Sequence, residues 1–118
     1  MLTKEAILAA GRVTHEAVTV PGLAEPLYVW QMTGLENDKL DDESYVDNGK
    51  GGVEFNHANY RARLFIACVR DADGVPKFGP GDLAAVSAMS AAVLNRVLEV
   101  ARRINGMTKA DVETAGKN

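Results

Sequence analysis

The stretch DADGVPKFGPGD, Asp71 to Asp82, holds the residues whose types and spacing best suit chemistry, here the binding of calcium. A calcium loop of the EF-hand type needs oxygen ligands at its first, third and fifth positions, a glycine at the sixth and a glutamate at the twelfth. If Gly74 is the sixth residue, the first and twelfth are Val69 and Pro80, which have no side-chain oxygen. If Asp71 is the first residue, a valine and a proline take the fifth and sixth positions. The spacing therefore argues against a metal site.

A turn explains the same stretch better. Glycine accepts the positive φ that a type I′ hairpin turn requires and aspartate tolerates it, so Asp73-Gly74 predicts such a turn. The segments on either side, Cys68–Arg70 and Val75–Phe78, would be its two short arms. We expect no metal ion and no cofactor in this chain.

Nucleophiles and bases are few and far apart. His15 lies in a strand pattern and His57 in the first turn of an expected helix, so neither is placed beside a nucleophile. Cys68 with a histidine would be the minimal nucleophilic pair, but it lies on an apolar helix stripe that favours burial. We therefore expect no catalytic residue and a protein that is not an enzyme; a small enzyme with an unfamiliar site is the least favoured alternative.

Two further patterns have a structural and a functional explanation. The run GKGG, Gly49 to Gly52, has a lysine among glycines but lacks the Gly-Lys-Ser/Thr ending of a phosphate loop, and predicts a mobile loop over residues 47–53. Four acids of the preceding segment could bind a cation, although on a helix they more plausibly form its solvated face: Asp38, Asp41, Asp42 and Glu43.

Composition indicates one soluble globular domain over residues 1–118, because 47% of the residues are apolar and 25% are charged. A net charge of −3 argues against a nucleic-acid partner. The single cysteine excludes an internal disulfide and is compatible with a reducing cytoplasm. The first residues do not resemble a signal peptide, and no apolar run is long enough to span a membrane.

The periodicity predicts an α+β fold in which a small N-terminal β-hairpin or antiparallel sheet packs with about four to five helices, the long one near the C-terminus. Thr3 should cap the first helix, with a staple between Leu2 and Ile7, and Gly11 should end it. The other expected elements are strands at Thr14–Val20 and Leu27–Met32, an acidic helix from about Leu35 to Tyr45, a helix capped by Asn56 with Phe55 stapled to Tyr60, a helix capped by Asp82 that runs to Gly106, and a short helix over 108–115.

Two of these elements have more apolar surface than one small core needs. On the second strand, Tyr28, Trp30 and Met32 share one face while the other face is also apolar, so the strand is sandwiched between helices or covered by a partner. Aromatic residues with methionine are also typical of adaptable binding surfaces, so these three are candidate partner-binding residues, although a place in the core is favoured.

The long helix has a similar surplus. Its polar residues occupy an arc of only about 120° at about 100° per residue, so either this helix is central to the domain or another chain covers part of it. The candidate partner-binding residues on it are Val93, Val97, Val100 and Ile104. If the helix binds a partner, Val97→Asp and Val100→Asp should weaken binding.

The order of these signals resembles that of the tail assembly chaperones of long-tailed, siphovirus-type bacteriophages. The similarity covers nearly the whole chain and consists of the stretches LTKEAIL, LYVWQMTG, NYRARLFIACV, RDADGVPKF and a terminal GKN, with no catalytic signature among them.

The resemblance implies a phage or prophage protein that binds the tape measure protein in the host bacterial cytoplasm, keeps it soluble during tail morphogenesis and is absent from the mature virion. It also implies self-association and a longer form made by programmed frameshifting. Lys117-Asn118 is a dipeptide that an A-rich slippery stretch of the gene would encode. Neither nucleic acid nor membrane is an expected partner. The alternative is a structural subunit, such as a head-tail connector or tail-completion protein, that forms a homo-oligomeric ring.

Overall fold

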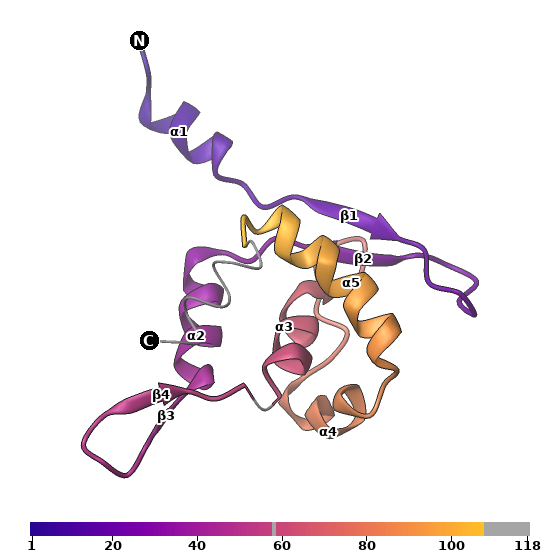
Figure 1. Ribbon diagram of the computed structural model, residues 1–118. Helices are drawn as coiled ribbons and strands as arrows, with labels where there is room; N and C mark the ends of the chain where they lie inside the picture. Colours follow the sequence, from indigo (N-terminus) through magenta and orange to yellow (C-terminus); the bar gives the residue numbers. More distant parts are fainter. Residues whose placement is uncertain (58, 108–118) are drawn as a thin grey trace.

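The computed structural model describes residues 1–57 and 59–107 (Figure 1). It has the α+β fold that the sequence predicts. In chain order the elements are α1 (Lys4–Ala10), β1 (His15–Val18), β2 (Leu27–Trp30), α2 (Gly34–Ser44), β3 (Tyr45–Asp47), β4 (Val53–Phe55), α3 (Tyr60–Cys68), β5 (Val69–Arg70), the 3-10 turn η1 (Pro80–Asp82), α4 (Leu83–Ser87) and α5 (Ala91–Ile104).

The main sheet is antiparallel, with the strand order β1-β2-β5. The predicted hairpin pairs His15 with Trp30 and Val18 with Leu27. The third strand, β5, follows α3 directly and pairs Val69 with Val29, and both of these valines are 0% exposed. At two residues β5 is too short for an alternating pattern to reveal it, but it anchors α3 to the sheet.

The turn after β5 is present but is not of type I′. Gly74 donates its N–H to the Asp71 carbonyl oxygen at 3.0 Å, and Asp71 donates its N–H to the Val75 carbonyl oxygen at 2.9 Å. Gly74 has a φ of +87°, whereas Asp73 is not in the positive-φ region. The Asp71 carboxylate accepts the N–H groups of Asp73 and Val75 at 2.8 and 3.0 Å. This acid therefore stabilises its own loop, as Asx turns do.

The core lies where α5 packs against α3 and against the β1–β2 hairpin, and Figure 1 shows α5 between them. Four side chains of α5 are buried: Leu94, Val97, Leu98 and Ala101. They meet the buried face of α3, which includes Leu64, Phe65 and Cys68. Most of the apolar surface of this helix is thus buried against its own chain, and α5 is the central helix of the domain.

The expected single helix from Asp82 to Gly106 is divided. The chain forms η1, then α4, and then α5 starts after Ser90. Asp82 occupies the cap position of α4, as predicted, but its carboxylate makes no cap bond there and instead accepts the Gly79 N–H at the start of the 3-10 turn, at 2.8 Å. Serine competes for backbone hydrogen bonds and favours helix ends, and Ser87 and Ser90 flank the break. The break turns Val86 of α4 into the core, where it is 1% exposed.

The segment between α2 and α3 also differs from expectation. The ends of the predicted loop over residues 47–53 pair as the β3–β4 hairpin, with Asp47 opposite Val53. Helix α3 begins at Tyr60, with Asn59 at the cap position in a left-handed conformation, so Asn56 is not its cap. Asn56 instead donates its N–H to the Ser44 carbonyl oxygen at 2.6 Å. The expected helix over 108–115 and Lys117-Asn118 lie outside the described residues.

Helix α1 and the β3–β4 hairpin project from the body (Figure 1). The radius of gyration is 15.7 Å, against about 13.5 Å for a compact chain of this length. Thr3 caps α1 as predicted, because its Oγ1 accepts the Ala6 N–H at 3.0 Å, and α1 ends at the Gly11 cap. No residue of α1 is buried, and Leu2 and Ile7, the expected staple, stay 76% and 55% exposed.

Candidate partner-binding surfaces

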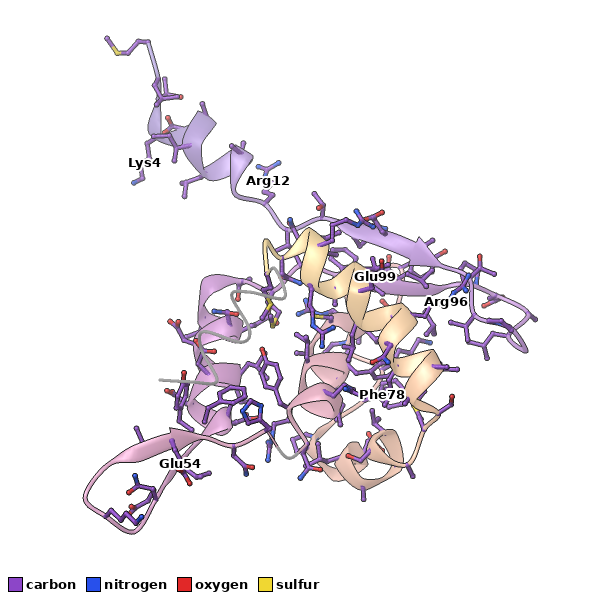
Figure 2. The ribbon with its side chains drawn as sticks, in the orientation of Figure 1. Lys4, Arg12, Glu54, Phe78, Arg96 and Glu99 are labelled. Atoms are coloured by element: carbon purple, nitrogen blue, oxygen red, sulfur yellow. The ribbon has the colours of Figure 1, made fainter. Side chains whose placement is uncertain are left out.

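An apolar groove lies between α2, α3 and the segment that leads into α4. Its cavity has a volume of about 250 Å³. Five of the lining side chains form an apolar floor: Leu40, Ile66, Ala67, Phe78 and Leu83. Phe78 packs against Phe65 of the core, with ring centroids 5.5 Å apart, and Figure 2 shows it beside α3. We call this surface the α2–α3 groove.

Two ion pairs join the walls of the α2–α3 groove. Arg70 Nη2 lies 2.9 Å from Glu36 Oε2, and Arg63 Nη1 lies 3.0 Å from Glu43 Oε2. Glu36 is in the first turn of α2 and Glu43 in the last, so the pairs are seven residues, or about 10.5 Å, apart along the helix axis. Leu40 lies between them and is 4% exposed. The groove is therefore an apolar trough that is charged at both ends of α2.

The ion pair at the start of α2 has the more buried arginine and the more hydrogen bonds. Arg70 is 8% exposed, and its Nε and Nη2 also donate to the Ala67 carbonyl oxygen at 3.1 and 3.0 Å. Partial burial raises the pKa of Glu36, but the hydrogen bond from the Thr33 N–H and the charge and hydrogen bond of Arg70 outweigh it, so the pKa is lowered. Glu36 also completes a capping box with Thr33. One carboxylate thus ties the start of α2 to β5.

Of the predicted aromatic surface, the structure keeps two residues together and removes the third. Tyr28 and Trp30 are half-buried, and His15 stacks on Trp30 with ring centroids 4.2 Å apart. Met32 lies beyond β2 and is 9% exposed, and its N–H donates to Asn105 Oδ1 at 2.7 Å. Met32 therefore belongs to the core beside the end of α5, the place that the sequence favours, and it is not part of a binding surface.

The predicted surface on α5 is also corrected. Val97 is 0% exposed, so a partner cannot reach it without unfolding the helix. Val93, Val100 and Ile104 are half-buried and pack against the core. The polar face of α5 is engaged as well: Arg96 donates to the Thr19 carbonyl oxygen at 2.8 Å, as its place in Figure 2 near the β1–β2 loop indicates. Helix α5 is a poor docking surface for these reasons.

Exposed apolar side chains gather on α1 instead. Ile7 and Leu8 are 55% and 63% exposed, and Leu2 just before the helix is 76% exposed. Figure 2 shows Lys4 of this helix far from the body of the protein. We call residues 1–11 the α1 arm. The other projecting element, the β3–β4 hairpin, exposes Val46 and Val53.

The residues that could have done covalent or metal chemistry are not assembled into a site. Cys68 is fully buried, and burial raises the pKa of its thiol to about 12. His15 stacks on Trp30 and His57 packs edge-on to Phe55, with ring centroids 4.7 Å apart. Among residues 1–57 and 59–107, no three or more His, Cys, Asp or Glu side chains cluster as metal ligands would.

The acids of α2 keep the exposure that the sequence predicts. Asp38, Asp41, Asp42 and Glu43 are all exposed, and Glu43 pairs with Arg63. Partial burial, with the neighbouring charges of Asp38 and Asp42, raises the pKa of Asp41. Within the part of the chain that the structure describes, no helix is long and apolar enough to cross a membrane.

The sequence contains a signal for the α2–α3 groove, but it is visible only when the spacings of its charged residues are compared. Glu36 and Glu43 are seven residues apart on α2, and Arg63 and Arg70 are seven residues apart around α3. Matched spacings of opposite charge allow two antiparallel segments to form both pairs at once, as α2 and the α3–β5 segment do. Pairing the two spacings would have placed these segments side by side.

No protein-family model, no curated protein and no solved structure matches the chain.

Proposed function

We propose that this protein is a phage tail assembly chaperone that binds the tape measure protein in the host bacterial cytoplasm and keeps it soluble during tail morphogenesis. The observation that carries the proposal is the α2–α3 groove, an apolar trough on a body whose core is already filled by its own chain. A surface of this kind takes the apolar face of a partner helix. A tape measure protein, expected to be helical with an apolar side, offers many such faces.

The size of the α2–α3 groove suits a carrier that must later release its cargo. An apolar cavity of about 150 Å³ holds a benzene-sized molecule, so one of about 250 Å³ takes roughly two aliphatic side chains. Burying two of them contributes about 3–6 kcal/mol, which is comparable with the roughly 4–15 kcal/mol that association costs. A single contact is therefore weak, and tight holding requires many copies along one long partner.

Co-expression with tape measure fragments tests this function. The parent chain should keep fragments soluble, and Ala67→Glu, which places a charge on the groove floor, should not. Ala85→Glu on the exposed side of α4 is the matched control. Leu83→Glu provides a second groove variant, and circular dichroism with urea unfolding identifies any variant that fails to fold. Fragments that stay equally soluble with folded Ala67→Glu and Leu83→Glu would remove the groove from the proposal.

The alternative, a structural ring subunit of the tail or head-tail connector, has one observation in its favour. An exposed α1 arm and a separate groove on the same chain are what a head-to-tail contact needs, and such contacts close into rings when the rotation allows. Mass spectrometry of purified virions separates the two functions. Stoichiometric amounts of the chain in finished particles would reject the chaperone and favour the ring subunit.

A further inference from the structure

Among residues 1–57 and 59–107, nothing buries the apolar side chains of the α1 arm. Its seven helical residues are all exposed, and isolated helices shorter than about 12 residues are marginal in water. Ile7 and Leu8 present adjacent branched side chains, and the remaining residues of the second half are alanines. An arm of this composition is stabilised when it lies against an apolar surface.

The helix of the α1 arm is as long as the segment of α2 between the two ion pairs of the α2–α3 groove. Seven helical residues are about 10.5 Å long, the same length that separates Glu36 from Glu43 along α2. The cavity takes roughly two aliphatic side chains, by comparison with an apolar cavity of about 150 Å³ that holds benzene. Ile7 and Leu8 supply two. The described part of each chain therefore has an exposed apolar helix and an apolar trough whose two ion pairs are one length of that helix apart along α2.

Charge does not oppose this contact. The arm has one acid and one base, Glu5 and Lys4, and the groove edge has both signs. Within the described residues Lys39 at the groove edge forms no ion pair, and neither does Glu5. Opposite charges at the rim of an interface fix orientation more than they add affinity.

We propose that the α2–α3 groove binds the α1 arm of a second copy of this chain. The arm is joined to β1, the sheet edge opposite β5, whereas Arg70 of β5 lines the groove. A contact between two different surfaces is heterologous, so each added copy leaves one free arm and one free groove, and the chains assemble into a closed ring or an open helical row. This inference does not depend on the proposed function, because it concerns only copies of this chain.

Complementation between two full-length variants tests the contact. Ile7→Asp with Leu8→Asp removes the arm's apolar side chains and leaves the groove, whereas Ala67→Glu blocks the groove and leaves the arm. Native mass spectrometry should find oligomers of the parent chain, monomers of each variant alone, and a one-to-one heterodimer when the two are mixed. Oligomers that persist in the arm variant, or mixed variants that stay monomeric, would overturn the proposal.

Two further measurements locate the contact. Val53→Asp alters an exposed apolar residue on the other projecting element and should leave the parent oligomers unchanged. In NMR spectra of the mixed variants, methyl signals of Leu40, Ile66 and Leu83 should shift on mixing. If Val53→Asp gives monomers, the hairpin is the interface. If the parent chain is monomeric and the methyl signals of the unmixed arm variant differ from those of the parent, the arm binds the groove of its own chain. Either of these two results rejects the arm-to-groove contact between copies.

Discussion

Trp30 Nε1 donates a hydrogen bond to the Asp71 carbonyl oxygen at 3.0 Å, and this contact ties the turn after β5 to the outer face of β2. The same indole ring lies 3.5 Å from the place that a Cβ at Gly74 would occupy. His15 stacks on the ring from the neighbouring strand. A turn that the sequence presents as a cluster of acids is thus held by an aromatic side chain of the strand paired with β5, 41 residues earlier in the sequence.

Gly74→Ala should destabilise the fold by about 1–2 kcal/mol, the cost of a left-handed conformation for a residue with a Cβ. Gly74 has a φ of +87°, and the new methyl would also touch the Trp30 ring. Gly34→Ala is the matched control, because Gly34 starts α2 without a positive φ and with open space around it. Urea unfolding of both variants provides the measurement. Equal midpoints would show that the backbone of this turn is not constrained as described.

Local signals predicted the ends of the first helix well. Thr3 caps it and Gly11 ends it, because a cap depends only on residues within one turn. The Asp73-Gly74 turn was predicted for the same reason, although its type was wrong. The Asp71 carboxylate accepts two N–H groups of the loop, and the loop is one residue longer than a two-residue turn. A rule based on the Asp73-Gly74 dipeptide does not include this contribution of Asp71.

Non-local facts could not be predicted in the same way. One sequence does not tell whether an apolar stripe is buried by its own chain or by another, so Val97 was assigned to a binding surface although α3 and the sheet cover it. The break before Ser90 interrupts a run of strong helix formers, where propensity favours one continuous helix. The α2–α3 groove depends on pairs such as Glu36 with Arg70, 34 residues apart.

Val97→Asp should abolish folding and Val100→Asp should not. Val97 is 0% exposed, and an unpaired carboxylate there costs at least about 4 kcal/mol. Val100 is half-buried, so its new carboxylate can reach water. Circular dichroism and the urea midpoint of each variant decide this. A cooperatively folded Val97→Asp with a midpoint near that of the parent would contradict the central position of α5.

The Glu36–Arg70 pair predicts a pH dependence with a definite sign. The folded-state pKa of Glu36 is lowered, so its carboxylate stabilises the fold above the unfolded pKa of about 4.3, and this contribution is lost as pH falls through the folded pKa. Glu36→Gln should therefore lower stability at neutral pH, and the difference should shrink as the pH falls through the lowered folded-state pKa of Glu36. The loss should be at most about 1 kcal/mol, because the Glu36 side chain is 41% exposed and water screens the pair.

Asp41 provides the control with the opposite sign. Its pKa is raised in the fold, so its carboxylate opposes folding at neutral pH and Asp41→Asn should increase stability there. Urea midpoints of the parent and both variants between acid and neutral pH measure the two differences. A Glu36→Gln midpoint that stays below the parent by the same amount at every pH would show that lost packing, and not lost charge, is responsible.

If the α1 arm of one copy occupies the groove of the next, it competes with the tape measure protein for the same site. Ile7→Asp with Leu8→Asp would then free every groove, and the variant should bind tape measure fragments with a lower apparent Kd than the parent chain, because the competent fraction rises. Titration of a labelled fragment by fluorescence anisotropy measures this at protein concentrations above and below those at which the parent self-associates. Ala67→Glu added to the arm variant should remove binding again. Weaker binding by the arm variant at all concentrations would mean that α1 itself contacts the tape measure protein. The arm and the tape measure protein would then not compete for the groove.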